Sequence, residues 1–226
     1  MTKSEVRSQI NEIGIIPVVR ASSTQKAFLA VEALQRCGIP VVEVTLTVPG
    51  AESVIESLRK SFASDLLVGA GTVLNTEAAK RCLDAGAQFI VSPGLNTATL
   101  DFVNSQNILM MAGALTPTEI MAALEHGADL IKIFPCSAAG GAGYIKALKG
   151  PFPQIAFIPT GGVNLQTAAD FIRAGAEALG IGGELVSSAA LDSGKPELIS
   201  DLGRQFLQIV REARAAKTTV GTANGR

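Results

Sequence analysis

The chain has 226 residues, of which 47% are hydrophobic and only 4% aromatic, and its formal net charge is −1. This length suits one large α/β domain or two small ones, and it can bury a sizeable core without covalent cross-links. A nearly neutral charge balance gives no electrostatic footprint for nucleic acid or for a membrane surface. The three cysteines lack C-x-x-C spacing, which is typical of reduced thiols in a cytosolic protein rather than of a disulfide framework or a zinc site.

The N-terminus is polar and lacks the apolar stretch of a secretory signal, and no apolar run is long enough to span a bilayer. We therefore expect a cytoplasmic protein that binds neither membranes nor nucleic acid. Residues 217–226 are rich in Thr, Gly and Ala, so we expect a single domain over residues 1–216 followed by a flexible tail.

One pattern occurs four times along the chain: a helix end, a glycine and a short apolar strand. The repeats stand roughly 40–50 residues apart, about two strand–helix units at ~20–30 residues each. The glycine of each repeat is expected to end its helix in the left-handed conformation. These glycines are Gly38, Gly86, Gly127 and Gly175.

Strand and helix patterns alternate through the whole chain. Further strands are predicted between the repeats, over residues 14–20, 66–70, 108–112 and 155–159. Helices are predicted over residues 24–37, 50–62, 76–85, 118–126, 165–174 and 196–215, and three of them have candidate N-caps at Thr76, Thr118 and Asn164.

Eight such units in this length predict an α/β fold, a single (β/α)₈ TIM barrel. Residues 2–12 are expected to form an extra N-terminal helix that closes the bottom of the barrel. A doubly wound open sheet is the alternative, but no G-x-G-x-x-G motif opens a first strand–helix turn.

One lysine interrupts an apolar run that otherwise has the composition of a buried parallel strand. The run is Asp-Leu-Ile-Lys-Ile-Phe-Pro, residues 129–135, with Lys132 in its middle. An unpaired buried ammonium is costly, so this lysine needs a partner or a chemical role. Burial favours the neutral amine, which can attack a carbonyl carbon and form a Schiff base. The alternative is a structural lysine paired with a carboxylate.

Strand alternation places a second charge in the same barrel. Glu43 alternates with Val42 and Val44 as Lys132 alternates with its isoleucine neighbours, so both charged side chains are expected to point into the barrel. A buried ion pair is often no better than apolar packing, which weakens a purely structural explanation. A lysine that forms an imine and a carboxylate that transfers protons fit this pair better.

Two glycine pairs stand where barrels commonly bind phosphate, in the loops after strands seven and eight. Thr160-Gly161-Gly162 precedes one predicted helix and Gly182-Gly183 precedes another, so backbone N–H groups are expected to hold an anion there. Glu184 follows the second pair. A carboxylate facing a phosphate repels it, so either Glu184 points away or the ligand is not a phosphate.

No H-x-H, paired-Asp or His/Glu cluster in the sequence suggests a metal. The single histidine, His126, precedes a helix-ending glycine, a position where its charge favours the helix C-terminus and a structural role.

Six motifs occur in order over roughly residues 10–210, and together they resemble the class I 2-keto-3-deoxy-6-phosphogluconate (KDPG) / 4-hydroxy-2-oxoglutarate (KHG) aldolase family. They are Val-Glu-Val-Thr-Leu (42–46), Gly-Ala-Gly-Thr-Val-Leu (69–74), Ile-Val-Ser-Pro-Gly-Leu (90–95), Ile-Lys-Ile-Phe-Pro (131–135), Tyr-Ile-Lys-Ala-Leu-Lys-Gly (144–150) and Pro-Thr-Gly-Gly-Val (159–163).

The resemblance implies a homotrimeric barrel that cleaves 2-keto-4-hydroxy acids to pyruvate and an aldehyde without metal or organic cofactor. It assigns imine formation to Lys132 and general acid/base catalysis to Glu43. The other residues that it assigns to substrate are Thr72 and Pro93 in the pyruvate pocket, Phe134 beside the imine, and Thr160, Gly161, Gly162, Gly182 and Gly183 at the phosphate end.

Two positions depart from the family pattern. Some members carry an arginine four residues after the glutamate, at the substrate carboxylate, where this chain has Thr47. Arg20, at the end of the first strand, matches another branch and is expected to take over that role through its bidentate guanidinium. Thr45 and Thr47 are expected to line the substrate site beside it. The second departure is Glu184, where members often have serine.

Three rival functions remain open from the sequence. One is an aldolase for another 2-keto-3-deoxy sugar acid, such as the galactonate epimer. Another is a phosphosugar isomerase or epimerase on the same barrel, working without an imine. The third is a non-catalytic phosphosugar-binding protein. The internal Glu43/Lys132 pair argues against the second and third.

Overall fold

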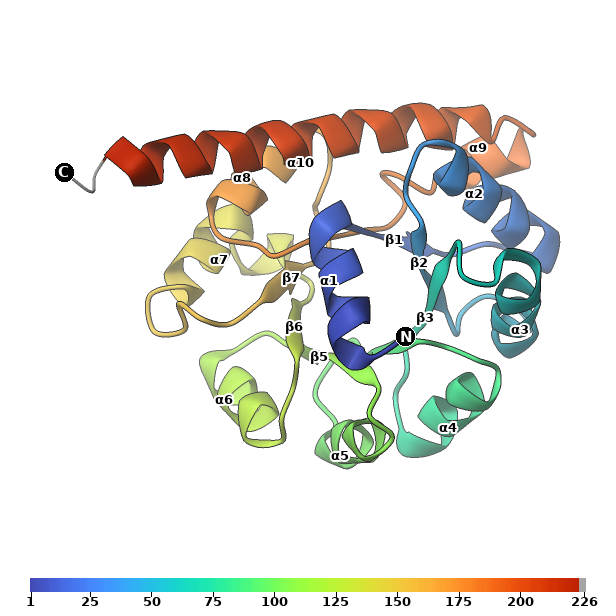
Figure 1. Ribbon diagram of the computed structural model, residues 1–226, viewed down its shortest axis with the longest axis horizontal. Helices are drawn as coiled ribbons and strands as arrows, with labels where there is room; N and C mark the ends of the chain where they lie inside the picture. The colour runs from blue at the N-terminus through green and yellow to red at the C-terminus, as the bar shows by residue number, and fades with distance from the viewer. Residues whose placement is uncertain (224–226) are drawn as a thin grey trace.

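A computed structural model describes residues 1–223 of the chain, which form a barrel of parallel strands surrounded by helices (Figure 1). The strands are β1 (Ile15–Val19), β2 (Val41–Thr45), β3 (Leu67–Gly71), β4 (Phe89–Val91), β5 (Leu109–Ala114), β6 (Leu130–Ile133), β7 (Phe157–Pro159) and β8 (Leu179–Ile181). The helices are α1 (Lys3–Ile13), α2 (Thr24–Arg36), α3 (Ala51–Phe62), α4 (Thr76–Asp84), α5 (Thr97–Ser105), α6 (Pro117–Glu125), the 3₁₀ turn η1 (Ser137–Ala139), α7 (Gly141–Leu148), α8 (Ala168–Arg173), α9 (Ser188–Asp192) and α10 (Glu197–Ala223).

The strands pair in the order β7-β6-β5-β4-β3-β2-β1-β8, and every pairing is parallel. A parallel bridge between Thr160 and Gly180 joins β7 to β8, the two ends of that order. The predicted eight-stranded barrel is therefore confirmed. The four repeat glycines all have positive φ, between 73° and 105°, as their predicted helix-ending role requires.

The inside of the barrel is apolar at the N-terminal ends of the strands, and α1 closes the barrel there. Val6 and Ile10 of this helix pack with the inward-facing residues of the strands, among them Phe89, Leu109 and Leu130. The predicted closing helix is thereby confirmed. Its start is fixed by a capping box in which Thr2 and Glu5 bond each other's backbone N–H groups.

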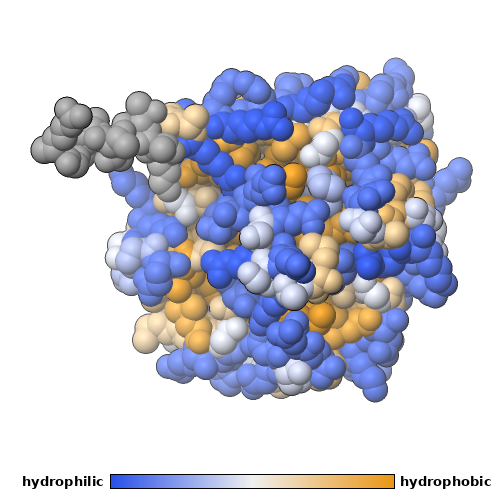
Figure 2. All heavy atoms as spheres, in the orientation of Figure 1, coloured by the Kyte–Doolittle hydropathy of each residue, from blue (hydrophilic) through white to orange (hydrophobic). Residues whose placement is uncertain are grey.

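The outward-facing strand residues pack against the ring of helices in a separate, larger core. The long helix α10 runs across one side of the molecule, where it lies against α2 and α8 (Figure 1). Figure 2 shows that the α1 face is mostly hydrophilic, with smaller hydrophobic areas between the polar ones. Within the described residues, no helix combines the length and the apolar character needed to cross a membrane.

Helix α10 extends to Ala223, beyond the predicted end at residue 215. The flexible tail expected over residues 217–226 stays a prediction, and residues 224–226 lie outside the described part of the chain.

Two of the predicted N-caps are wrong by one or two residues. The cap of α4 is Asn75, whose side chain accepts a hydrogen bond from the Ala78 N–H. The cap of α6 is Thr116, because Pro117 fits the first helical position and Glu119 completes a capping box.

The third predicted cap, Asn164, belongs to a turn rather than to a helix start. Its side-chain oxygen accepts hydrogen bonds from the N–H groups of Gln166 and Thr167, both at 3.0 Å. This local turn delays the start of α8 to Ala168, three residues after the predicted start.

Candidate functional site

The two predicted charged side chains meet inside the barrel. Lys132 of β6 and Glu43 of β2 are 4% and 2% exposed, and Lys132 Nζ lies 3.6 Å from Glu43 Oε1. Their strand neighbours Ile131, Ile133 and Val44 pack in the outer core, so alternation turns both charges inward. The predicted proximity of this pair is confirmed.

The Glu43 carboxylate is buried with one unused acceptor. Oε1 has no hydrogen-bond partner among the described residues, and its distance to Lys132 Nζ exceeds that of a good charged hydrogen bond. A buried polar atom without a partner is rare and marks a place where another donor is expected. Substrate or water positioned between the two side chains could supply that donor.

Space for the Glu43 carboxylate comes from the neighbouring strand, where Gly71 has no side chain. A Cβ atom at this glycine would stand 1.9 Å from Glu43 Oε1 and 2.5 Å from its Cδ. Gly71 is the register partner of Thr45 in the β2–β3 pairing. The carboxylate therefore occupies volume that any other residue at position 71 would fill.

Threonines lie at the C-terminal ends of β2 and β3. The buried Thr45 hydroxyl donates to the Val19 carbonyl at 3.1 Å and lies 2.7 Å from the hydroxyl of the exposed Thr47. Thr72 follows Gly71 and has a φ of 59°, an uncommon conformation for a β-branched residue. Such local strain clusters at functional sites, and it coincides here with a residue predicted to contact substrate.

Pro93 follows β4, and β5 lies between it and the strand of the lysine. A Cβ built on Gly113 would come within 2.4 Å of the Pro93 backbone, and Gly113 is the register partner of Lys132. The Gly113 N–H donates to the Ser92 hydroxyl at 3.1 Å, which ties the two strand ends together. Ser92 and the spacer glycines at 71 and 113 were not predicted, because their roles depend on contacts between strands.

A pocket of about 200 Å³ opens at the ends of β1, β6, β7 and β8, and we call it the distal pocket. Phe134 connects it to the lysine, because Lys132 Nζ lies 5.6 Å from the centre of the Phe134 ring. Seven predicted substrate residues line this pocket. The complete lining is Val18, Arg20, Phe134, Thr160, Gly161, Gly162, Val163, Gly180, Gly182, Gly183 and Glu184.

The glycine loops of the distal pocket use their carbonyl groups within the protein. The Gly161 carbonyl accepts from the Ser137 N–H, and the Gly182 carbonyl accepts from two N–H groups of the following turn. No acceptor for the N–H groups of Gly162, Gly182 or Gly183 occurs in residues 1–223. Free N–H groups converging on a pocket are suited to an oxygen-rich ligand.

Cys136 and His126 take no part in the Lys132–Glu43 pair or in the distal pocket. Burial raises the pKa of the Cys136 thiol to about 11, so this cysteine is a poor nucleophile near neutral pH. His126 lies 2.8 Å from Asp101 Oδ1 at the surface, consistent with the predicted structural role. Across the described part of the chain, no group of three or more His, Cys, Asp or Glu residues has the arrangement of a metal site.

A buried lysine and a carboxylate at the C-terminal end of a (β/α)₈ barrel define the class as Schiff-base barrel enzymes. A family profile described as "KDPG and KHG aldolase" matches residues 6–202. The chain belongs to the KDPG and KHG aldolase family.

Relatives and solved structures support this membership over nearly the whole chain. The 2-dehydro-3-deoxy-phosphogluconate aldolase of Treponema pallidum is 35% identical over 202 residues, covering 89% of this chain and 95% of that protein. The KHG/KDPG aldolase of Escherichia coli K12 is 34% identical, with 91% and 96% covered. The KDPG aldolase of Legionella pneumophila, with pyruvate captured as a covalent carbinolamine, superposes with a TM-score of 0.82 at 32% identity, with 88% and 96% covered.

Proposed function

We propose that this protein is a class I aldolase that cleaves 2-keto-4-hydroxy acids, such as KDPG or 4-hydroxy-2-oxoglutarate, to pyruvate and an aldehyde. The observation that carries the proposal is the buried Lys132–Glu43 pair, 3.6 Å apart and with Glu43 Oε1 unpartnered. A purely structural ion pair would gain from direct hydrogen bonds that close this gap.

Lys132 is the nucleophile of the proposed reaction. Its neutral amine attacks the C2 carbonyl of the substrate, and the carbinolamine loses water to give an imine. The imine nitrogen then accepts the electron pair released when the C3–C4 bond breaks. An aldehyde leaves, and pyruvate remains on the lysine as an enamine.

Glu43 moves the protons that these steps require. It takes the C4 hydroxyl proton as the C–C bond breaks and returns a proton to C3 of the enamine, after which water releases pyruvate. A carboxylate already held beside the lysine makes both transfers local, and its free Oε1 is the acceptor that they need.

The remaining residues bind and orient substrate. We assign the pyruvate end of the substrate to Thr45, Thr47, Thr72 and Pro93, which lie at the C-terminal ends of β2, β3 and β4. The sequence led us to expect Arg20 at the substrate carboxylate, but Arg20 lines the distal pocket with the glycine loops. We therefore assign the far end of the substrate to this pocket, where free N–H groups and the Arg20 guanidinium offer hydrogen bonds.

Turnover tests this function directly. Pyruvate release from KDPG and from 4-hydroxy-2-oxoglutarate is measured by coupling to lactate dehydrogenase, with Lys132→Ala and Glu43→Gln as variants. We expect activity that resists EDTA, its complete loss in Lys132→Ala, and a loss of about 10²–10⁴-fold in Glu43→Gln. Full pyruvate release by Lys132→Ala would exclude an imine on Lys132, and a wild-type protein that releases no pyruvate from either substrate would favour an isomerase or epimerase.

We also propose a cytoplasmic homotrimer with one domain over residues 1–216. The family resemblance supports the trimer, and the exposed apolar side chains of Leu74 and Met121 provide surface for subunit contacts. Three free, buried thiols suit a reducing compartment. Light scattering after size-exclusion chromatography tests the assembly, and a monomeric mass would contradict it.

A further inference from the structure

The charged groups of the distal pocket have opposite signs. Arg20 and Glu184 are both exposed at its rim, and neither side chain takes part in an ion pair within the described residues. Each charge is therefore available to a ligand. Together they leave the lining of the pocket without net charge, which is an unusual setting for a dianion.

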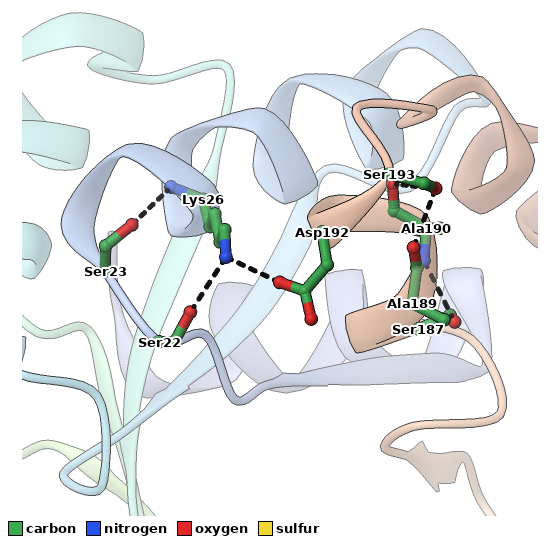
Figure 3. Close-up of polar contacts among 8 residues, drawn as sticks. All are labelled: Ser22, Ser23, Lys26, Ser187, Ala189, Ala190, Asp192 and Ser193. Atoms are coloured by element: carbon green, nitrogen blue, oxygen red, sulfur yellow. Dashed lines mark hydrogen bonds and ion pairs between the residues drawn. The ribbon is translucent and has the colours of Figure 1, made fainter.

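No second cation reinforces Arg20 at this pocket. Lys26 lines a separate hollow with Arg20, and its ammonium is held by Asp192 at 2.5 Å and by Ser22 at 3.1 Å. Figure 3 shows this lysine reaching from α2 to Asp192 at the end of α9. The contact joins α2, which follows Arg20, to α9, which follows Glu184.

The hydrogen-bonding groups of the distal pocket also match a terminal hydroxyl group of the substrate better than a terminal phosphate group. The backbone N–H groups of Gly162, Gly182 and Gly183 and the Arg20 guanidinium donate, whereas the Glu184 carboxylate only accepts. A phosphate dianion offers acceptors alone, so it leaves Glu184 without a donor and is repelled by its charge. A terminal hydroxyl group both donates and accepts, so it satisfies Glu184 and the N–H groups together.

We infer that Glu184 is a specificity-determining residue that disfavours a phosphorylated substrate. The preferred substrates are then 2-keto-3-deoxy sugar acids that end in a free hydroxyl group. The inference rests on the proposed aldolase function and extends it to the far end of the substrate.

A matched pair of substrates tests the inference: KDPG and 2-keto-3-deoxygluconate, which differ only in the terminal phosphate. The specificity ratio is kcat/KM for KDPG divided by kcat/KM for the unphosphorylated acid. Glu184→Gln keeps the shape and removes the charge, and we expect it to raise this ratio about tenfold at low salt and less at high salt. Glu197→Gln, an equal charge change at the exposed start of α10, should leave the ratio unchanged.

A binding measurement separates failure of this inference from failure of the aldolase assignment. Inorganic phosphate is titrated into wild-type protein and Glu184→Gln by calorimetry, without turnover, and we expect the variant to bind it about tenfold more tightly. Unchanged phosphate affinity together with an unchanged specificity ratio would overturn the role of Glu184. Tighter phosphate binding by Glu184→Gln, together with a wild-type protein that cleaves no 2-keto acid, would retain the role of Glu184 and overturn the aldolase assignment.

Discussion

Replacing Gly71 with alanine should displace the Glu43 carboxylate while leaving Lys132 in place. The added Cβ would stand 1.9 Å from Glu43 Oε1 and 2.5 Å from its Cγ and Cδ, whereas ordinary carbon contacts begin near ~3.5 Å. The carboxylate must therefore move by more than about 1 Å. Because Gly71 does not have a positive φ, alanine fits the backbone, and the effect is confined to this overlap.

The expected loss follows from how sensitive proton transfer is to position. A misplacement of about 1 Å costs roughly 10²-fold in rate, so kcat in Gly71→Ala should fall about 100-fold. Overpacking should lower the free energy of unfolding by only about 1–3 kcal/mol. Coupled pyruvate release measures the first quantity, and urea unfolding followed by circular dichroism measures the second.

A shorter carboxylate should partly restore the Gly71→Ala variant. Glu43→Asp withdraws the carboxylate by one methylene group, so the double variant should lose much less activity than the product of the two single losses. Gly143→Ala is the matched control, because a Cβ there meets nothing within 4 Å and should leave kcat unchanged. Wild-type kcat in a folded Gly71→Ala protein would refute the positioning argument.

Three further predictions concern stability, each measured by urea unfolding. Burial raises the pKa of Cys82 and of Cys136 to about 11; the folded state favours the neutral thiols, so stability should fall as pH rises from about 9 to about 11, by about 2 kcal/mol per thiol. The double variant Cys82→Ala/Cys136→Ala should lose less stability over this pH range, and an equal loss would show that the two thiols are not its cause. Two backbone N–H groups at the start of α6 lower the pKa of Glu119, so its contribution is lost as pH drops through the acid range, and Glu119→Gln should cost about 1 kcal/mol at pH 7 but little at pH 3. Arg214 donates to main-chain carbonyls at the end of α1 and in the turn before β8, so Arg214→Met should cost about 2 kcal/mol, and an unchanged midpoint would refute that role.

The barrel and the inward placement of Lys132 and Glu43 could be predicted because each depends on periodicity along a single segment. Apolar alternation turns Glu43 and Lys132 inward, and the repeat glycines mark where helices end. Both features are local, so the sequence carries them directly.

Features that depend on register between strands could not be predicted in the same way. The space that Gly71 leaves for Glu43 exists only because β2 and β3 align Thr45 with Gly71. The unused N–H groups of Gly162 and Gly182 likewise emerge only once the partners of the neighbouring carbonyls are known.

Helix starts were predictable only approximately, because adjacent polar residues compete for the same backbone donors. Asn75 rather than Thr76 caps α4, and Asn164 forms a turn of its own instead of starting α8. Such competition is decided by small differences in local geometry.

Covalent trapping tests the central claim, that Lys132 forms an imine with the keto acid. The protein is incubated with pyruvate and sodium borohydride, and intact and peptide mass spectra locate any adduct. We expect one stable pyruvate-derived adduct on Lys132 in wild-type protein and none in Lys132→Ala. An adduct-free wild-type protein that demonstrably binds pyruvate, or an adduct on another lysine, would contradict it.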